Sequence, residues 1–422
     1  MHKKTVLKNG LKIITSHMPH MESVSIGVWI GVGARYEEKR LCGMSHLIEH
    51  MLFKGTLTRA ANVLKEAIEG VGGSFNGFTS EEATCYLVKL PSVYTKLGLD
   101  ILSDMVLNSK LDPAELEKEK YVICEEIKMY MDHPGHHVFD ILAETMWPNH
   151  ALGRPIAGYN DTIKRFKRED LTGFMNKYYV PANVSVVLCG KLGKSEECVS
   201  FLKNTFRRPS PKRSFSYTPV TVGRSARIKP CYKDTKQSHL AFGFHSARRS
   251  HPLRYAVAIL NIILGGNMSS RLFERLREQN PLCYEISSSV RRYKETGAFV
   301  IHAGIDNAKL EEATAEIIRE LTTIKENCVT KDELKRAKEY LSGQLLLALE
   351  DTASRMLWLG ERIVLEGKAP DLKKIVYGVN KVTTEDVKCA ANMIFKKKNL
   401  NFATIGPAGK DIGKKLKKLV VL

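Results

Sequence analysis

An internal repeat constrains the fold of this chain more than any other feature of the sequence. Residues 169–190 (EDLTGFMNKYYVPANVSVVLCG) align without a gap to residues 385–406 (EDVKCAANMIFKKKNLNFATIG), 216 positions later. Asn183 and Asn399 occupy the same place in the two segments. Each segment opens with acidic residues typical of a first helical turn and closes with a short apolar run typical of a strand. Each half of the chain therefore ends in the same helix–turn–strand unit.

A weaker similarity at the start of the two halves extends the repeat. Residues 25–33 (SIGVWIGVG) and 239–245 (HLAFGFH) both predict a strand before a helical stretch. A period near 200 residues is too long for a solenoid and fits duplication of a whole domain. We therefore expect an α+β fold of two similar domains, each an antiparallel or mixed sheet packed with helices. The domains are predicted at 1–206 and 239–422, joined by a basic, proline-containing surface linker over 207–238.

The cysteine content and the apolar runs limit the cellular setting. Nine cysteines are present, an odd number, and none forms a CxxC pair. A disulfide framework or a cysteine zinc finger is therefore not expected, and reduced thiols fit a reducing compartment. The N-terminus lacks a signal-like apolar run, and no long apolar stretch predicts a membrane span. From these features we expect a cytoplasmic protein.

The charge balance is strongly basic. Lys and Arg number 65 against 46 Asp and Glu, a formal net charge of +19. Such a surplus can attract nucleic acid or anionic surfaces, but the basic runs are dispersed and no recognition motif with interleaved aromatic residues accompanies them. No specific nucleic-acid partner is therefore expected. The basic, amphipathic residues 413–422 are interpreted as a solvated end rather than a membrane anchor.

Residues 43–56 (GMSHLIEHMLFKGT) form a helical window with a metal-binding pattern. His46, Glu49 and His50 stand in the order H-x-x-E-H, the inverse of the H-E-x-x-H zinc pattern. At about 100° per residue, the two imidazoles lie about 40° apart on one helix face, with the carboxylate beside them. Two neutral imidazoles can hold Zn²⁺ and leave a position open. The carboxylate can then act as a general base on water.

A catalytic zinc of this type needs a third ligand from another element. The acidic stretch 114–131 (AELEKEKYVICEEIKMYM) predicts a helix that carries Glu119, Glu125 and Glu126. Glu119 and Glu126 are seven residues apart and share one face. One can bind the ion while the other orients a ligand through a hydrogen bond. This reasoning leaves both Glu125 and Glu126 open as the ligand.

A second histidine cluster follows this helix. His133, His136 and His137 surround a Pro-Gly pair at Pro134 and Gly135, which predicts the end of the helix. We interpret the cluster as solvated histidines in a loop, with a second metal site as the alternative.

The segment HLIEHMLFKGT, residues 46–56, resembles the signature of the insulinase/pitrilysin family of zinc peptidases. The similarity is greatest to mitochondrial processing peptidase and its bacterial relatives. It implies a metallopeptidase that hydrolyses peptides, with Glu49 as the general base and Glu119 in support of the metal site. It also implies one Zn²⁺ per chain, bound by His46, His50 and Glu126.

Two further segments carry the resemblance. Residues 72–86 (GGSFNGFTSEEATCY) are similar to a strand of the family in which an asparagine, here Asn76, holds the substrate backbone. Gly77 stands where the family usually has alanine. Residues 269–286 (SSRLFERLREQNPLCYEI) are similar to a distal segment with an Arg/Tyr pair. This similarity implies two substrate and transition-state contacts: Arg277 and Tyr284.

The second half contains no H-x-x-E-H pattern. We therefore expect it to be catalytically empty and to serve substrate binding. The resemblance implies that two chains close around a chamber, so a homodimer is expected, with extended or unfolded peptide segments added as strands to a sheet edge. The alternative is a catalytically silent scaffold or assembly subunit of the same family.

Overall fold

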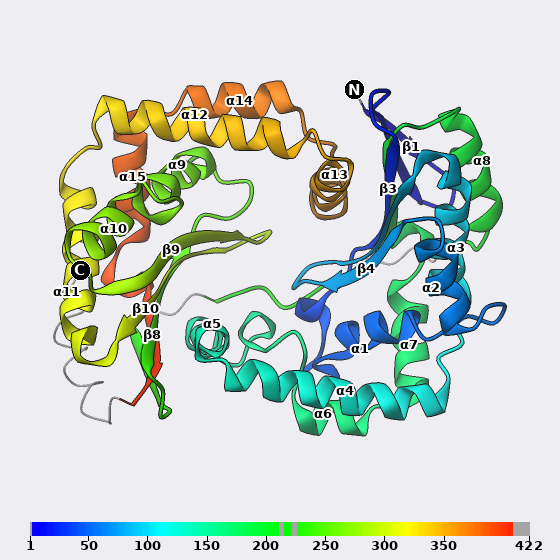
Figure 1. Cartoon of the computed structure of the whole chain (residues 1–422), viewed down its shortest axis with the longest axis horizontal. Helices are drawn as coiled ribbons and strands as arrows, with labels where there is room; N and C mark the ends of the chain where they lie inside the picture. Colours follow the sequence, from blue (N-terminus) through cyan, green and yellow to red (C-terminus); the bar gives the residue numbers. More distant parts are fainter. Residues whose placement is uncertain (1, 211–214, 222–225, 408–422) are drawn as a thin grey trace. The chain divides into compact units, whose positions relative to one another are not determined.

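The structure of the chain, a computed structural model, describes residues 2–210, 215–221 and 226–407. The basic residues 413–422 and parts of the expected linker lie outside this range. The chain divides into two compact units, each built around one sheet (Figure 1). The first comprises Met1–Ile127, Pro155–Thr218 and Leu346–Pro370, and the second comprises Lys128–Arg154, Pro219–Leu345 and Asp371–Leu422.

The first unit contains a mixed six-stranded sheet in the order β1-β2-β6-β3-β5-β4. All neighbours are antiparallel except β2 and β6, which run parallel. The strands are β1 (His2–Val6), β2 (Lys12–His17), β6 (Val184–Gly190), β3 (Ser23–Ile30), β5 (Thr84–Pro91) and β4 (Ser74–Thr79). Every residue of β6 is buried, because both faces of the sheet are covered. Strand β4 lies at the edge and pairs only with β5 among the described strands.

Helices cover both faces of this sheet. The main apolar core lies on one face, and α13 packs on the other face against β3 and β6. Thr352 at the start of α13 hydrogen-bonds to Ser25 on β3, with 2.9 Å between the hydroxyl oxygens. The helices are α1 (Met44–Leu52), α2 (Ala61–Glu69), α3 (Thr95–Asn108), α4 (Pro113–Asp132, whose last turn falls in the second unit), α6 (Asn160–Arg165), α7 (Arg168–Tyr178), α8 (Ser195–Thr205) and α13 (Thr352–Glu366).

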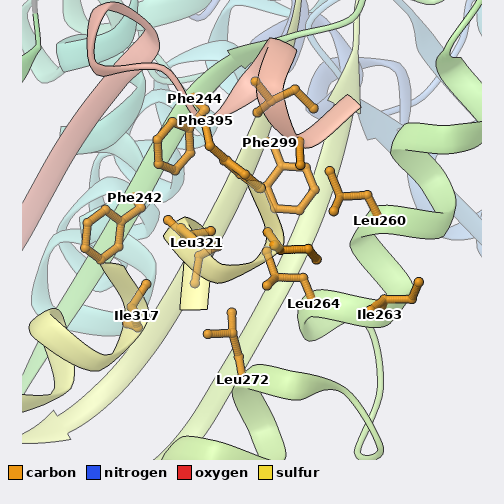
Figure 2. Close-up of a cluster of buried hydrophobic side chains, with 14 of the residues drawn as sticks. Phe242, Phe244, Leu260, Ile263, Leu264, Leu272, Phe299, Ile317, Leu321 and Phe395 are labelled. Atoms are coloured by element: carbon orange, nitrogen blue, oxygen red, sulfur yellow. The ribbon is translucent and has the colours of Figure 1, made fainter. Parts of the chain in front are cut away.

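The second unit contains a five-stranded sheet in the order β7-β11-β8-β10-β9. Its main core, shown in Figure 2, packs Phe395 edge-on against Phe244 and Phe299, at 5.1 and 5.3 Å between ring centroids. The strands are β7 (Arg227–Tyr232), β11 (Leu400–Gly406), β8 (Gln237–Ser246), β10 (Gly297–Asp306) and β9 (Cys283–Arg292). The helices are α5 (Pro134–Met146), α9 (Arg254–Gly265), α10 (Arg271–Phe273), α11 (Leu310–Glu326), α12 (Lys331–Ala348), α14 (Leu372–Asn380) and α15 (Thr384–Ile394). No helix in the described part of the chain is long and apolar enough to cross a membrane.

The predicted duplication is confirmed by the helix–strand unit that ends each half. Helix α7 and strand β6 have the same bounds as α15 and β11 after a shift of 216 residues. The repeated asparagine hydrogen-bonds to the end of the preceding helix in both copies. Asn183 Nδ2 donates to Tyr178 O at 2.9 Å, and Asn399 Nδ2 donates to Ile394 O at 3.0 Å. In each copy this bond goes to a carbonyl in the last turn of the helix, where carbonyls lack a partner within the helix.

The two units exchange one helix along the chain. Helix α5 lies in the N-terminal half of the sequence but packs on the sheet of the second unit, whereas α13 lies in the C-terminal half and packs on the first sheet. A glycine lies beneath each helix, and Gly27 and Gly243 are 216 positions apart. A Cβ on Gly27 would overlap the sulfur of Met356, and one on Gly243 would overlap that of Met146. The compact units are therefore discontinuous in sequence.

Part of the segment expected as a linker belongs to the second sheet. Residues 227–232 form β7, which pairs parallel with β11. Pro230 interrupts the apolar alternation that would predict a strand. An edge strand tolerates a proline, because on its outer side there is no neighbouring strand for a backbone N–H to pair with.

The packing of α13 gives a stability prediction. Gly360 faces the indole of Trp29, and a Cβ on this glycine would overlap the ring. Gly→Ala in an exposed helix usually stabilises by about 1 kcal/mol, but we expect Gly360→Ala to destabilise by about 2–3 kcal/mol because overpacking displaces the ring. Gly173 of α7 has open space around it, so Gly173→Ala should stabilise slightly. Thermal and urea unfolding of the two variants measure this difference, and equal midpoints would contradict the packing described here.

Candidate active site

Helix α1 separates an apolar face from a polar face. Six of its nine residues are buried: Met44, Ser45, Leu47, Ile48, Met51 and Leu52. His46, Glu49 and His50 lie on the other face, at the i, i+3, i+4 spacing that brings side chains together on a helix. The apolar face fixes the helix on the core, and this fixes the direction of the three polar side chains.

The start of α1 is held by two features. The buried Glu37 carboxylate accepts hydrogen bonds from Gly43 N at 2.8 Å and Ser45 N at 2.7 Å. A carboxylate at this end also interacts favourably with the helix dipole. Gly43 has a φ of +94°, and a Cβ there would lie 2.7 Å from Ile163 Cδ1 and 2.8 Å from Ala157 O. The helix therefore begins at a position that only glycine fits.

The structure brings His46, His50 and Glu126 of α4 together. Each histidine Nε2 lies 3.7 Å from Glu126 Oε2, and all three ligand atoms lie within 4.8 Å of one another. With bonds of about 2.0–2.2 Å, two ligands of a tetrahedral zinc ion lie about 3.4 Å apart, so the donors fit one ion. No other group of three such side chains was found in the described part of the chain. Glu125 is exposed on α4, so of the two glutamates left open by the sequence it is Glu126 that lies in the cluster.

A second glutamate and a lysine support this cluster. Glu119 Oε2 lies 3.0 Å from His50 Nδ1, and Lys54 Nζ lies 2.6 Å from Glu119 Oε1. Burial alone would raise the pKa of Glu119, but its bonds with His50 and Lys54 lower it. A carboxylate that accepts the Nδ1 proton leaves the Nε2 lone pair of His50 facing Glu126. Sequence reasoning missed Lys54, although its spacing of four from His50 was a signal.

The two histidines have different protonation tendencies. Burial, with a smaller effect of neighbouring His50, lowers the pKa of His46 to about 4. Burial also acts to lower the pKa of His50, but the hydrogen bond with Glu119 and the nearby carboxylates raise it overall. His46 is therefore neutral near pH 7, the form that binds a metal ion.

Glu49 lies beside the cluster without belonging to it. Burial raises the pKa of its carboxyl group, partly offset by a hydrogen bond in which Thr79 Oγ1 donates to Glu49 Oε2 at 2.6 Å. Gly77 lies on the same face of β4 as Thr79 and leaves room for the Glu49 side chain. A Cβ on Gly77 would lie 3.2 Å from Glu49 Cγ. Thr79 was not identified from the sequence, because nothing in its spacing relates it to the helix motif.

Asn76 lies on β4 but points to the opposite face of the strand from Gly77 and Thr79. Its side chain is exposed, and its Oδ1 accepts a hydrogen bond from Gly77 N at 2.8 Å. The structure therefore places Asn76 on the edge strand of the sheet and does not bring its side chain to Glu49.

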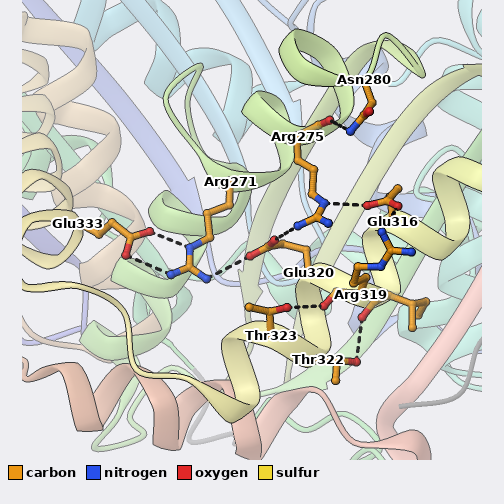
Figure 3. A network of polar contacts seen from close by, with 10 residues as sticks. Arg271, Arg275, Asn280, Glu316, Arg319, Glu320, Thr322, Thr323 and Glu333 are labelled. Atoms are coloured by element: carbon orange, nitrogen blue, oxygen red, sulfur yellow. Dashed lines mark hydrogen bonds and ion pairs between the residues drawn. The ribbon is translucent and has the colours of Figure 1, made fainter.

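Arg277 and Tyr284 lie in the second unit, next to each other. The Arg277 guanidinium is 4.7 Å from the ring centroid of Phe273 and 5.0 Å from the ring centroid of Tyr284. Tyr284 is 76% exposed. Ion pairs anchor the segment before Arg277, as Figure 3 shows. Arg271 binds Glu333 at 2.7 Å and Glu320 at 3.1 Å, and Arg275 binds Glu316 at 2.7 Å. The short π-helix that carries Arg277, Glu274–Gln279, is thereby fixed to α11 and α12.

The second histidine cluster does not form the expected loop. His133 is the single residue between α4 and α5, and Pro134 begins α5, because proline is favoured in a first helical turn. The rings of His133 and His136 are stacked with 5.2 Å between centroids, and both residues are exposed. His137 is half-buried, and none of the three belongs to a group of three metal-binding side chains in the described residues.

Comparison with known proteins gives consistent matches over most of the chain. Residues 12–160 match the family described as Insulinase (Peptidase family M16), and residues 165–341 match the Peptidase M16 inactive domain. The uncharacterized zinc protease YmxG of Bacillus subtilis is 36% identical, over 97% of this chain and 99% of its own length. An uncharacterized zinc protease of Mycobacterium tuberculosis is 32% identical, over 96% of this chain and 93% of its own length.

Solved structures share the fold. A protease from Helicobacter pylori superimposes with a TM-score of 0.89 at 22% identity, covering 96% of this chain and 99% of its own. A peptidase M16 inactive domain structure from Pseudomonas fluorescens gives a TM-score of 0.87 at 19% identity, covering 97% of this chain and 98% of its own. At these identities the likeness shows the two-unit architecture.

Proposed function

The chain belongs to peptidase family M16, the insulinase family, and on that basis we propose that it is a zinc metalloendopeptidase that cuts extended or unfolded peptide segments. Its relatives are named zinc proteases, which supports a metallopeptidase in general terms. The observation that carries the more specific proposal is the cluster of His46, His50 and Glu126 with Glu49 beside it.

In this proposal the cluster holds one Zn²⁺ per chain. When bound, the ion supplies a Lewis acid for the scissile carbonyl and lowers the pKa of water. His46 and His50 present Nε2 lone pairs, and Glu126 adds a negative charge that offsets the charge of the ion. Glu119 orients His50 through Nδ1, and Lys54 holds Glu119 in its charged form.

Glu49 is the proposed general base. It takes a proton from the attacking water and passes it to the leaving amine. Burial raises its pKa, and a carboxylate with a raised pKa is a better proton acceptor near neutral pH. The Glu49 side chain stays within reach of the cluster because it is three residues after His46 on the same helix, a spacing that places two side chains side by side.

The substrate is proposed to bind at the free edge of β4. An extended peptide can add to an edge strand by main-chain hydrogen bonds, and Asn76 lies on this strand with its side chain exposed. A folded protein has few free backbone groups for such pairing, because its own secondary structure uses them. This favours unfolded segments over folded domains, as in processing peptidases.

We extend the proposal to the second unit and to assembly. Two chains would close around a chamber as a homodimer, with Arg277 and Tyr284 contacting the substrate and stabilising the oxyanion. A catalytically silent scaffold subunit is the alternative function. The complete set of His46, Glu49, His50 and Glu126 does not favour this alternative, because a scaffold would not need these side chains in one place.

The purified chain, supplied with Zn²⁺, should cut an unstructured peptide of mixed composition at internal bonds, with fragments identified by mass spectrometry. The same sequence within a stably folded domain should remain intact. The absence of any fragment from several unrelated unstructured peptides would contradict the proposal.

A further inference from the structure

We propose that Thr79 is a positioning residue for Glu49, through which the strand that receives the peptide sets the orientation of the base. This inference rests on the proposed function and concerns the same site. It starts from one face of β4, the face that packs against α1.

Three alternate residues of β4 form this face. The ring of Phe75 packs against that of Phe53, just after α1, with 4.7 Å between centroids. Gly77 leaves the space beside Glu49, since a Cβ on it would lie 3.2 Å from Glu49 Cγ and 3.0 Å from the Phe53 ring. The Thr79 hydroxyl then donates to Glu49 Oε2 at 2.6 Å. On this face of the strand, Phe75 therefore packs beside α1, Gly77 leaves space for the Glu49 side chain, and Thr79 donates a hydrogen bond to the Glu49 carboxylate.

The bond from Thr79 is the only hydrogen bond that the Glu49 carboxylate makes with the described residues. It engages one carboxylate oxygen, Oε2, and leaves Oε1 free to accept a proton from water. Without this bond the carboxylate could rotate about its terminal torsion, which is broad for glutamate. A base has to be held within about 0.5 Å of its working position to be effective.

Thr79 is itself held by the end of the β4–β5 hairpin. In the turn that follows, Ser80 N and Ser80 Oγ both donate to Ala83 O at 2.8 Å. Thr79 pairs through its backbone with Thr84 of β5, directly opposite. This end of β4 is therefore fixed to the sheet, while the start of the strand is more exposed.

A peptide paired with β4 would thus share one rigid strand with the group that orients the base. The position of its scissile bond relative to Glu49 would follow from the pairing register. Loss of the Thr79 hydroxyl should then slow the chemical step and leave peptide binding and metal binding in place.

Thr79→Val removes the hydroxyl with little change of shape. We expect kcat to fall about tenfold, with KM changed by less than about twofold and the zinc content unchanged. The affinity of the metal-free chain for a fluorescent peptide should also be unchanged. Thr79→Ser retains a donor and should restore kcat to within about threefold of the wild type.

Thr84→Val is the matched control, because the Thr84 hydroxyl donates to Val32 O at 2.9 Å and makes no bond with β4 or Glu49. It should lower the melting temperature and leave kcat within about twofold of the wild type. In a Glu49→Gln background, Thr79→Val should cause no further loss, since the two residues act as one unit.

A crystal structure of zinc-bound Thr79→Val provides a readout without turnover, and should show the Glu49 carboxylate rotated from its wild-type orientation. The inference is overturned if kcat is unchanged, if zinc or peptide affinity falls together with kcat, if Thr84→Val slows the reaction equally, or if the carboxylate keeps its orientation. If the wild type cuts no peptide, the proposed function fails, whereas wild-type cleavage with an unaffected Thr79→Val overturns only the role of Thr79.

Discussion

Replacing Glu49 by glutamine is expected to lower kcat for peptide cleavage by about 10³-fold. The amide has nearly the same shape as the carboxylate but cannot accept a proton from water. Glu49 lies outside the group of three proposed ligands, so the variant should bind zinc and peptide as the wild type does. The measurement is kcat and KM on an unstructured peptide, together with the zinc content of each protein.

Glu66→Gln on α2 serves as a control for this variant. Glu66 is exposed, and its carboxylate accepts a hydrogen bond from Asn62 of the same helix rather than from a proposed ligand. The control variant should cleave as fast as the wild type. Wild-type turnover by Glu49→Gln would show that another group accepts the proton. A loss of zinc from Glu49→Gln would instead show that Glu49 is a ligand and that the roles assigned on α1 are wrong.

Removing the metal with a chelator is expected to reduce peptide cleavage to background, and added Zn²⁺ should restore it. The chain's own side chains supply a base and hydrogen bonds, but no group at the cluster that can polarise a carbonyl strongly. Mg²⁺ should not restore activity, because it prefers six oxygen ligands and the cluster offers two imidazole nitrogens. The rates before chelation, after chelation and after each addition measure the effect.

His50→Ala separates loss of the ion from side effects of the chelator. Replacing even a residue that only orients a ligand typically costs about 10–100-fold in metal affinity, so loss of a direct ligand should cost at least that much. Zinc concentrations that restore the chelated wild type should therefore leave His50→Ala inactive. Full activity of the chelated wild type in the absence of metal would contradict the proposed mechanism.

Much of the site could be predicted because its signals are local. The spacing of His46, Glu49 and His50 places them on one helix face by geometry alone, and the apolar residues between them fix that face outward from the core. The remote carboxylate is harder to predict, because Glu125 and Glu126 are neighbours about 100° apart on a helix. Which of them turns inward depends on how α4 packs, and the structure places Glu126 in the cluster.

Other features depend on contacts that the sequence does not reveal. The duplication was visible as a repeat, but the exchange of α5 and α13 depends on which sheet each helix packs against. Strand β7 was not predicted, because it lies in a basic, proline-containing segment. An edge strand tolerates a proline and needs no clear apolar alternation. Thr79 meets Glu49 only because a hairpin packs on α1.

The most direct test of the central claim is the zinc content of two neighbouring variants on α4. The wild type and Glu125→Gln should each bind one zinc ion per chain, whereas Glu126→Gln should bind zinc at least about 100-fold more weakly and lose cleavage. Elemental analysis after dialysis, with a chelator-competition titration, measures both quantities. Equal zinc affinity in Glu126→Gln and Glu125→Gln would contradict a metal centre formed by His46, His50 and Glu126.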